Sequence, residues 1–408
     1  MLKEKSKTQI TMNTKIVAIV IIAVLAIAGV TTAVILMQPK DTVSYDASSF
    51  NVVSRVNSEG SGLYVKETVA DISGAMPVNR ENGVAFFGDG FSLSEANKAA
   101  WAGLIFGDPG SQSIQHIQLA TIADSVGLKF AQYTEGTSVS NDTLYYITNL
   151  NNFGNITADT HIQGGIVWEP QFQRVIQEDA RYVMLALTND VFTGHACCII
   201  AANHNWLGDN SGDMVKFLAA YSKAVDYINE AKKNPAGEAY ADVKAIAIAK
   251  TVGLTGAEVD AALATITYLY ADDEKGSLSD LKDNIADLAS SLDDLGFITS
   301  SKFKDSKKVA NAFVDDSFLK DAVAGKASKD GTATLKVAVI KGDIHQLAIH
   351  VAIEKGYFAE YGLTIQLSEG SSGGDIATLL TSKDVQIGFL GAPPATLKTI
   401  NSECIVVG

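Results

Sequence analysis

Residues 335–343 read LKVAVIKGD, a run rich in β-branched residues that ends in a Gly-Asp turn. An amphipathic helical pattern follows over residues 344–357. Two more strand-like runs come next, at residues 363–367 and 385–390, and a helical stretch follows each of them. Strands that alternate with helices predict βαβ units around a parallel sheet.

The sheet that begins at residue 335 is not complete when the chain reaches residue 408. Residues 404–408 read CIVVG, a strand-like run with no helix after it. A parallel sheet that stopped here would leave apolar faces uncovered. We therefore expect the remaining strands to come from an earlier part of this chain or from another chain.

Four stretches of the C-terminal segment stand out: GDIHQLA at residues 342–348, EKGYFAEYGL at 354–363, GSSGGDI at 370–376 and GFLGAPPA at 388–395. With these stretches the segment resembles the first lobe of the periplasmic-type solute-binding proteins of the nitrate, sulfonate, taurine and bicarbonate transporter family. The resemblance covers nearly the whole segment in the family's order and spacing. It implies an α/β fold of the periplasmic-binding-protein type II, with two lobes of doubly wound sheet joined by a hinge.

Earlier residues resemble the parts of this family that normally follow. They are NSEGSGL at 57–63 for the crossing to lobe II, residues 101–115 for the strand, glycine-serine turn and helix that open lobe II, GGIVWEP at 164–170, and CCIIA at 197–201 for the strand that returns to lobe I. The family's order therefore appears with its first part last. The chain is either one circularly permuted domain or two incomplete copies. We favour permutation, because the pieces are complementary and overlap only in a strand represented by residues 51–53 and 405–407.

The resemblance divides the chain into segments. Residues 325–334 form a linker of small and polar residues. It would join the position of the family's usual C-terminus to that of its usual N-terminus, and such a tether spans about 15 to 20 Å. The other segments are a basic segment at 1–15, a membrane anchor at 16–37, a tether at 38–49, a lobe I strand and crossing at 50–100, lobe II at 101–196, the return to lobe I with C-terminal-type helices at 197–324, and the first half of lobe I at 335–408.

The N-terminal residues predict a single-pass anchor. Lys3, Lys5 and Lys7 precede an uncharged apolar run at residues 16–37, which as a helix spans roughly 30 Å of hydrocarbon. Basic residues before the run favour a cytoplasmic N-terminus and a body outside the cytoplasm. The alternative is export after cleavage of a signal peptide, whose apolar region is usually about 7 to 15 residues long. No cysteine lies near Met37 to carry a lipid.

Composition agrees with an exported body. The net charge of −14 argues against binding to nucleic acid or to anionic lipid. Three cysteines are too few for a disulfide framework. The sequons at Asn141 and Asn155 would be open to glycosylation outside the cell. We expect a monomer without a cofactor.

Turns at the predicted strand ends indicate a ligand site. Ligands of open α/β sheets lie beyond the carboxyl ends of the strands. Glycines allow a close approach of backbone, and helix starts attract anions. The alternative is that these Gly-Ser turns only connect strands to helices. The candidate ligand-binding residues are Asp343, His345, Gln346, Ser371, Ser372, Gly373, Gly391, Ala392 and Pro393 from lobe I, with Ser61, Ser111, Gln112, Trp168 and Glu169 from lobe II.

Several of these candidates have a structural interpretation as well. His345 is either a cap residue at a helix start or a donor to the ligand, and Gln346 is equally ambiguous. Trp168 and Glu169 either line the cleft or belong to the interior of lobe II. If Glu169 faces the ligand, the ligand offers donors of its own, which weakens the case for a bare nitrate.

The stretch GHACC at residues 194–198 predicts no metal site. Neighbouring side chains of a strand point to opposite faces, so Cys197 and Cys198 are not expected to share a metal. His195 and Cys197 provide only two ligands where four are usual. Enzymes of a related branch, which make the thiamine pyrimidine, carry a dense cysteine cluster that is absent here. We interpret these cysteines as core or hinge residues.

The resemblance implies a membrane-anchored, extracytoplasmic solute-binding protein that is not an enzyme. Its lobes would close on a small oxyanion or an organic sulfonate or carboxylate, and the closed form would dock on an ABC permease with its ATPase. Two alternatives stay open. One is an enzyme of the thiamine-pyrimidine type, which needs a metal and pyridoxal phosphate. The other is a ligand-sensing module of the same fold without transport.

Overall fold

The computed structural model describes residues 45–47, 49–72, 78–81, 84–87, 101–192, 194–251, 253–402 and 405–407. The predicted basic segment and membrane anchor, residues 1–37, lie outside this part of the chain. Among the described residues, none of the helices has the length and apolar character that crossing a membrane requires.

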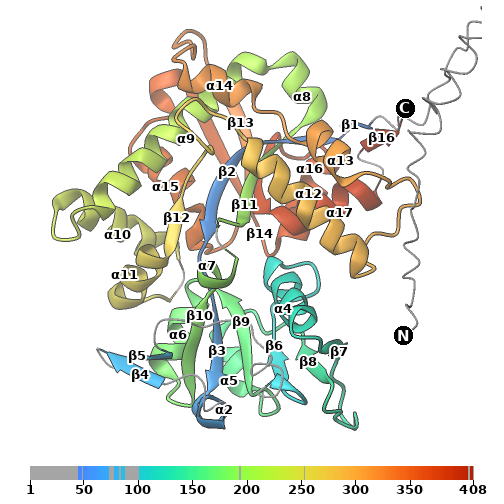
Figure 1. The fold of residues 1–408 in the computed structure, drawn as a ribbon. Coiled ribbons are helices and arrows are strands. Elements are labelled where there is room, and N and C mark those ends of the chain that lie inside the picture. Colours follow the sequence, from blue (N-terminus) through green and yellow to red (C-terminus); the bar gives the residue numbers. More distant parts are fainter. Residues whose placement is uncertain are drawn as a thin grey trace, which may run out of the picture. The chain divides into compact units, whose positions relative to one another are not determined.

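Residues 43–408 form one compact unit that contains two lobes, each built on its own sheet (Figure 1). The sheet of lobe I has the strand order β12 (Ile266–Tyr268), β2 (Phe50–Glu59), β11 (Ala196–Asn203), β15 (Ile387–Gly391), β13 (Ala333–Ile340) and β14 (Leu363–Gly370). The sheet of lobe II has the order β4 (Val78–Glu81), β5 (Val84–Phe87), β10 (Tyr182–Leu187), β3 (Ser61–Lys66), β9 (Gly164–Trp168), β6 (Ile105–Gly107), β8 (Thr143–Ile147) and β7 (Lys129–Gln132).

The C-terminal strands complete the sheet of lobe I, as the alternation of strands and helices predicts. Strand β13 pairs in parallel with β14 and β15, and β15 pairs antiparallel with β11. Strand β11 in turn pairs antiparallel with β2, so it separates the C-terminal strands from β2. The expected overlap between residues 405–407 and 51–53 is wrong. Strand β16 (Ile405–Val407) pairs instead with β1 (Tyr45–Ala47) in a separate two-stranded sheet.

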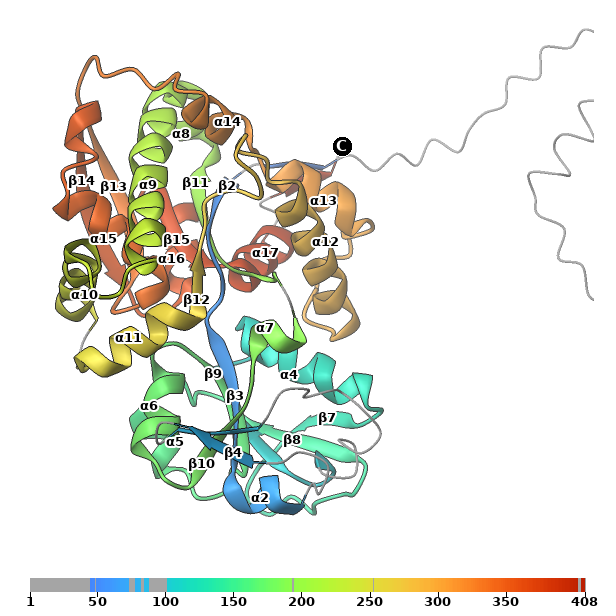
Figure 2. The same cartoon turned by 60° about the vertical axis from the view of Figure 1, so that its left-hand side comes forward.

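Helices cover both faces of the lobe I sheet (Figure 2). Helices α9 (Ser211–Lys232) and α15 (Leu347–Glu354) lie on one face, and α12 (Ser279–Asp294) and α17 (Ala392–Asn401) lie on the other. All eight residues of β11 are buried as a result. Burial on both faces explains why this strand reads as continuous apolar sequence rather than as alternation.

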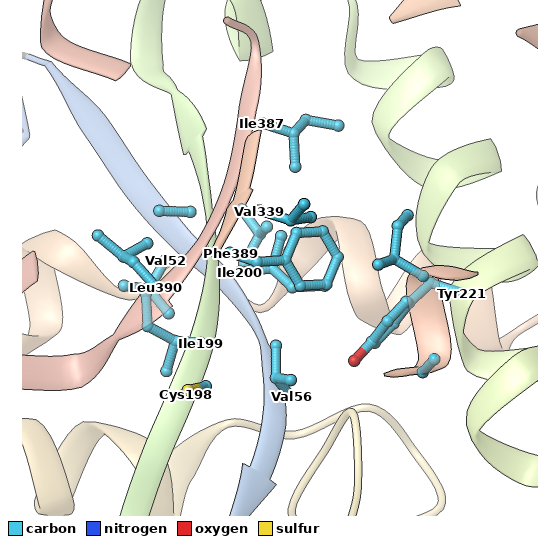
Figure 3. Packing of buried hydrophobic residues seen from close by; sticks show 14 of the residues in the cluster. Val52, Val56, Cys198, Ile199, Ile200, Tyr221, Val339, Ile387, Phe389 and Leu390 are labelled. Carbon is cyan, nitrogen blue, oxygen red and sulfur yellow. The ribbon is translucent and has the colours of Figure 1, made fainter. Parts of the chain in front are cut away.

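Part of the core of lobe I lies between this sheet and helix α9. Phe389 of β15 meets Tyr221 of α9 edge-on with ring centroids 5.5 Å apart, and Ile200 of β11 belongs to the same buried cluster (Figure 3). Aromatic pairs of this kind add about 0.5 to 1.5 kcal/mol beyond the burial of their area. The core therefore joins a strand from the C-terminal segment to a helix from the middle of the chain.

The chain crosses between the lobes twice. The first crossing is at Gly60, between β2 and β3, where φ is +83°. The second follows β10 through α7 (Thr188–Val191) and ends where β11 begins. Two short crossings leave the lobes connected by few backbone bonds, which is the usual construction of a hinge.

Candidate ligand site between the two lobes

A cavity of about 450 Å³ lies between the lobes, beyond the carboxyl ends of β13, β14 and β15. This volume is within the usual range for pockets that hold small organic molecules. Its lining from lobe I is Cys197, Cys198, Ile340, Lys341, Gly342, Asp343, His345, Ser371, Ser372, Gly373, Gly374, Gly391, Pro393 and Pro394, and from lobe II it is Pro109, Gly110, Gln112, Ser113, Ile114, Gln115, Asn151, Asn152, Trp168, Pro170 and Gln171.

The first residues of two lobe I helices line the cavity. Helix α16 (Gly373–Thr381) begins after Ser372, whose Oγ accepts a hydrogen bond from the backbone N–H of Asp375 at 3.2 Å. The first N–H groups of a helix have no partner within the helix, so they remain available to an anion. Helix α17 also starts here, but Pro393 and Pro394 have no N–H to offer. Helix α16 is therefore the stronger of these two anion-binding positions.

Lobe II contributes helix starts from the opposite side. Helix α4 (Ile114–Ser125) begins after Ser113, whose Oγ accepts from the N–H of His116 at 3.1 Å. Helix α6 (Gln171–Glu178) begins after Pro170. Both starts line the cavity, so the positive ends of helices from both lobes converge on it.

The Ser371–Ser372 turn is stabilised by hydrogen bonds to the carboxylate of Asp375. The hydroxyl of Ser371 donates to the carboxylate of Asp375, and the backbone N–H of Ser371 donates to the same oxygen at 3.0 Å. These hydrogen bonds lower the pKa of Asp375, because they favour its ionised form. The turn is thus fixed in place at the start of α16.

Lys341 supplies an unpaired positive charge at the cavity. Its side chain is exposed, and it forms no ion pair within the part of the chain that the structure describes. It follows the last residue of β13 directly, where the chain turns through Gly342. An amine at this position can approach an anionic group that sits on the helix starts.

His345 binds the protein through both ring nitrogens. Nδ1 lies 2.8 Å from Oδ1 of Asp343, and Nε2 lies 2.9 Å from the carbonyl oxygen of Gly60. Burial lowers the pKa of His345, but the carboxylate of Asp343, the sulfur of Cys197 and the carbonyl of Gly60 together outweigh it, and the pKa rises to about 9. The ring is therefore a cation whose two N–H groups are already used. This arrangement agrees with the structural interpretation of His345, not with a donor to the ligand.

The two lobes approach each other at several places around the site. One is the edge-on contact of the His116 ring of α4 with Phe297 of lobe I, whose centroids lie 5.6 Å apart. At the cavity, a Cβ built on Gly374 would lie 3.7 Å from Oε1 of Gln112. Away from it, Thr265 donates to Glu169 at 2.7 Å, and Nε of Arg174 lies 3.2 Å from Oε1 of Glu258. Glu169 and Arg174 belong to lobe II, whereas Glu258 and Thr265 belong to α11 (Gly256–Thr265), which leads into β12 of lobe I.

Most of the residues predicted to bind a ligand lie on the cavity. The structure brings together residues from three turns of lobe I and two segments of lobe II. They are Asp343, His345, Ser371, Ser372, Gly373, Gly391, Pro393, Gln112 and Trp168. Their contact with a ligand stays a prediction.

Five predicted residues do not line the cavity. Gln346 is buried and ties β13 to β15, accepting from the N–H of Ile340 at 2.9 Å and donating to the carbonyl of Phe389 at 3.3 Å. Ala392 is fully buried, and Ser111 is exposed outside the cavity.

Ser61 and Glu169, the other two, have partners in the protein. Ser61 accepts a hydrogen bond from Nε2 of Gln115 at 2.8 Å, so it positions a residue that does line the cavity. Glu169 is fully buried and accepts from Nε2 of Gln173 at 3.0 Å and from Thr265. Burial raises the pKa of Glu169. Glu169 therefore does not face the ligand, and it gives no reason to expect a ligand that donates hydrogen bonds.

The prediction that Cys197 and Cys198 point to opposite faces is wrong. The pairing of β11 with β2 shifts register on both sides of Cys198, as in a β-bulge. A bulge interrupts the alternation of side chains and re-aims them. The two Sγ atoms lie 4.0 Å apart, and both residues line the cavity. Within the described residues, no group of three or more His, Cys, Asp or Glu side chains could hold a metal.

Sequence reasoning missed other lining residues. Lys341 had a signal, because it is the charged residue at the end of an apolar strand and one position before the predicted turn. Asn151 and Asn152 follow β8, at the same edge of the sheet as the other strand ends. Gln115 had no such signal, since it lies inside the first turn of α4 and is buried.

Topology establishes the fold class. In each sheet most strands run in one direction, and the strand that arrives from the other lobe, β11 or β3, inserts antiparallel to both of its neighbours. The edge strands β12 and β4 are also antiparallel to their neighbours. The two-lobed α/β fold of the periplasmic-binding-protein type II is thereby confirmed.

Residues 344–404 match the family model described as NMT1/THI5 like. We call them the NMT1/THI5-like segment. No curated protein matches the chain.

Two solved structures are similar to this chain. One is the ligand-binding component of an ABC-type import system from Staphylococcus aureus, with zinc bound, at 13% identity, over 67% of this chain and 75% of that chain, with a TM-score of 0.41. The other is the periplasmic nitrate-binding protein from Synechocystis PCC 6803, at 10% identity, over 68% of each chain, with a TM-score of 0.47.

Proposed function

We propose that this protein binds a small anionic or zwitterionic organic solute between its lobes. The observation that carries the proposal is the cavity itself, which is lined by helix starts from both lobes and by Lys341, whose amine has no ion pair among the described residues. Helix starts and an amine both stabilise negative charge in a ligand. Binding to both lobes favours the closed arrangement over an open one, and this difference in affinity is all that closure requires.

The lining favours an organic sulfonate or carboxylate over a bare oxyanion. A volume of about 450 Å³ leaves room for a carbon skeleton next to the charged group. Trp168 offers an apolar surface for it. The amides of Gln112, Asn151 and Asn152 can both donate and accept hydrogen bonds, which suits a zwitterion such as taurine.

We propose further that the protein delivers this solute to an ABC permease and its ATPase. Residues 16–37 would anchor it to the membrane as a monomer with its body outside the cytoplasm. The two crossings at Gly60 and before β11 provide the hinge for closure. The competing role, a sensor without transport, predicts that no permease or ATPase genes lie beside its own.

We also propose that the two-lobed body of this chain is one circularly permuted domain. The NMT1/THI5-like segment comes last in the chain, yet its strands share a sheet with β2 and β11. Two partial copies would each need a sheet of their own. Residues 325–334 would then be the linker between the old ends.

Calorimetric titration tests the solute. Residues 43–408 would be titrated with taurine, alkanesulfonates, nitrate and bicarbonate. We expect heat from a sulfonate, and Lys341→Gln should weaken its binding about tenfold, the scale of one charge-assisted hydrogen bond. Lys275→Gln is the matched control, because Lys275 is exposed and lies outside the cavity. No heat from any of the four ligand classes would reject the assignment, and an equal loss in both variants would reject the role of Lys341.

The enzyme alternative keeps one observation in its favour, the match of the NMT1/THI5-like segment. An enzyme of the thiamine-pyrimidine type needs pyridoxal phosphate and a metal. The described residues do not fit the metal, because no cluster of three or more suitable ligands lies among them. Metal analysis and an absorption spectrum of the purified protein separate this alternative from solute binding.

A further inference from the structure

Cys197 and Cys198 form a pair of thiols at the cavity. They are the second and third residues of strand β11, shortly after the second crossing between the lobes. The shift of register around Cys198 turns both side chains toward one side, so that the two Sγ atoms lie 4.0 Å apart. Each residue is only 5% exposed, and the cavity is the surface that both share. A reagent small enough to enter the cavity therefore meets both sulfurs.

The surroundings make the two thiols different. The sulfurs of Cys197 and Cys198 are within hydrogen-bond distance of each other, and this hydrogen bond lowers the pKa of Cys197. The cationic ring of His345 acts in the same direction. The same hydrogen bond and burial raise the pKa of Cys198 well above its ordinary value. Cys197 therefore has the character of a nucleophile, and Cys198 beside it keeps its proton.

This is the arrangement of an oxidisable pair. A cysteine that reacts with peroxide needs thiolate character, access and a second thiol within reach. Cys197 has the first two through its neighbours and the cavity, and Cys198 is the second thiol. We propose that Cys197 and Cys198 are a redox-active dithiol, which a small hydroperoxide oxidises to a disulfide. The proposal concerns the thiols alone and holds whether or not the cavity takes a sulfonate or carboxylate.

The reaction balances in two steps. The thiolate of Cys197 attacks one oxygen of the hydroperoxide, the O–O bond breaks, and the released alkoxide or hydroxide takes a proton. Cys197 is then a sulfenic acid. The sulfur of Cys198 attacks that sulfur, the S–S bond forms, and the S–O bond breaks to release water that contains the Cys198 proton. The protein loses two electrons, and the hydroperoxide gains them.

The product should be easy to reduce again. Neighbouring Cα atoms lie about 3.8 Å apart, whereas disulfides usually join Cα atoms about 4.4 to 6.8 Å apart. A disulfide between adjacent residues is therefore strained, and strained disulfides are the labile ones. Oxidation is expected to act as a reversible modification and not as a structural crosslink.

Mass spectrometry of the full chain tests the proposal. The native protein would be treated with graded hydrogen peroxide, denatured, labelled with N-ethylmaleimide and digested with trypsin. We expect the peptide that contains both cysteines to become two hydrogen atoms lighter and to lose its labels. Dithiothreitol before labelling should restore both labels. Cys404 falls in a different tryptic peptide and reports the general exposure to oxidant.

Two variants assign the roles. In Cys198→Ser, dimedone should trap a sulfenic acid on Cys197. In Cys197→Ser, Cys198 should oxidise at least about tenfold more slowly than the wild-type pair, because it keeps its proton. The proposal fails if both wild-type cysteines stay labelled at a peroxide dose that oxidises free cysteine, or if Cys197 joins Cys404 instead. If a variant does not fold, the wild-type peptide map still decides between these outcomes.

Discussion

At the scale of single residues, His345 connects the site to the hinge. Its ring bridges Asp343 at the cavity and the carbonyl of Gly60 at the first crossing. Because the folded protein raises the pKa of His345 from 6.5 to about 9, the protonated ring stabilises the fold. That stability is fully present below pH 6.5 and is lost as the pH rises through about 9.

Urea unfolding at pH 6.5 and pH 9.5 measures this contribution. The wild type should lose up to about 3 kcal/mol more than His345→Gln between the two pH values, since one pKa unit is worth about 1.4 kcal/mol. The variant keeps a donor but has no titrating group. If both proteins lose the same stability, the ion pair with Asp343 does not contribute.

The sequence predicted the position of single residues best where a turn ended a strand, although their contact with a ligand stays a prediction. Ser371, Gly373 and Gly391 lie on the cavity because strand ends of a parallel sheet share one edge. It failed where the neighbour that binds a residue is distant in sequence. Glu169 is satisfied by Thr265, and the two cysteines share a face because of a bulge. The alternation of apolar and polar residues along a strand predicts neither the contact with Thr265 nor the bulge.

At the scale of elements, the passage from β2 to β3 depends on glycine. Gly60 has φ +83°, and a Cβ there would lie 2.4 Å from Nε2 of His345 and 2.8 Å from Cγ1 of Ile266. A left-handed φ costs a side chain roughly 1 to 2 kcal/mol, and the contact adds to that cost. We expect Gly60→Ala to unfold at clearly lower urea than the wild type.

Gly356→Ala is the matched control for this change. Gly356 has φ +73°, and nothing lies within 4 Å of a Cβ at that position. It therefore reports the backbone cost alone. Equal losses of unfolding free energy in the two variants would mean that the approach of His345 to Gly60 does not constrain the crossing.

A buried ion pair joins β2 to Asp272, in the loop that precedes helix α12. Nε of Arg55 lies 2.5 Å from Oδ1 of Asp272, and both side chains are about 5% exposed or less. The other carboxylate oxygen accepts from the N–H of Asp280 at 2.7 Å, at the start of the helix. Removing one partner of such a pair leaves an uncompensated buried charge, which costs about 3 to 5 kcal/mol.

Arg55→Met is expected to show that loss in urea unfolding. Lys129→Met serves as the control, because the pair between Lys129 and Asp142 is exposed, with side chains 74% and 50% accessible. Exposed pairs contribute about 1 kcal/mol or less. Similar losses of unfolding free energy in the two variants would show that burial does not make the Arg55–Asp272 pair more important than an exposed pair.

Sequence patterns predicted the elements better than their order. The strands at 335–340, 363–367 and 385–390 are present, with bounds that differ by a few residues. The place of β11 between β2 and β15 was not predicted, because periodicity describes one segment at a time. Neighbours in a sheet are set by topology, and topology depends on the whole chain.

At the scale of the whole molecule, contacts between the lobes hold the cleft narrow. Thr265→Val removes the hydroxyl that donates to Glu169 and keeps the size of the side chain. We expect the ligand-free protein to open, with a larger radius of gyration in small-angle X-ray scattering. Thr121→Val is the control, because the Thr121 hydroxyl donates within α4 to the carbonyl of Ile117 at 2.9 Å. An unchanged radius in both variants would assign closure to other contacts.

The joined sheet of lobe I predicts the result of limited proteolysis. Residues 326–332 have no helix or strand and are mostly exposed, so a protease should cut them first. The two fragments should co-elute in gel filtration without denaturant, since β15 pairs with β11 along five residue positions. Separation of the fragments would show that the C-terminal strands do not belong to this sheet.

The order of the strands along the chain also decides which lobe can fold first during synthesis. The strands of lobe II all lie between Ser61 and Leu187, so that lobe can fold while the rest is still being made. Strand β11 is made well before its partner β15, which is translated close to the end of the chain together with β13 and β14. A nascent or stalled polypeptide therefore exposes unpaired edges that invite association with other chains, and a chaperone that shields them would aid its biogenesis.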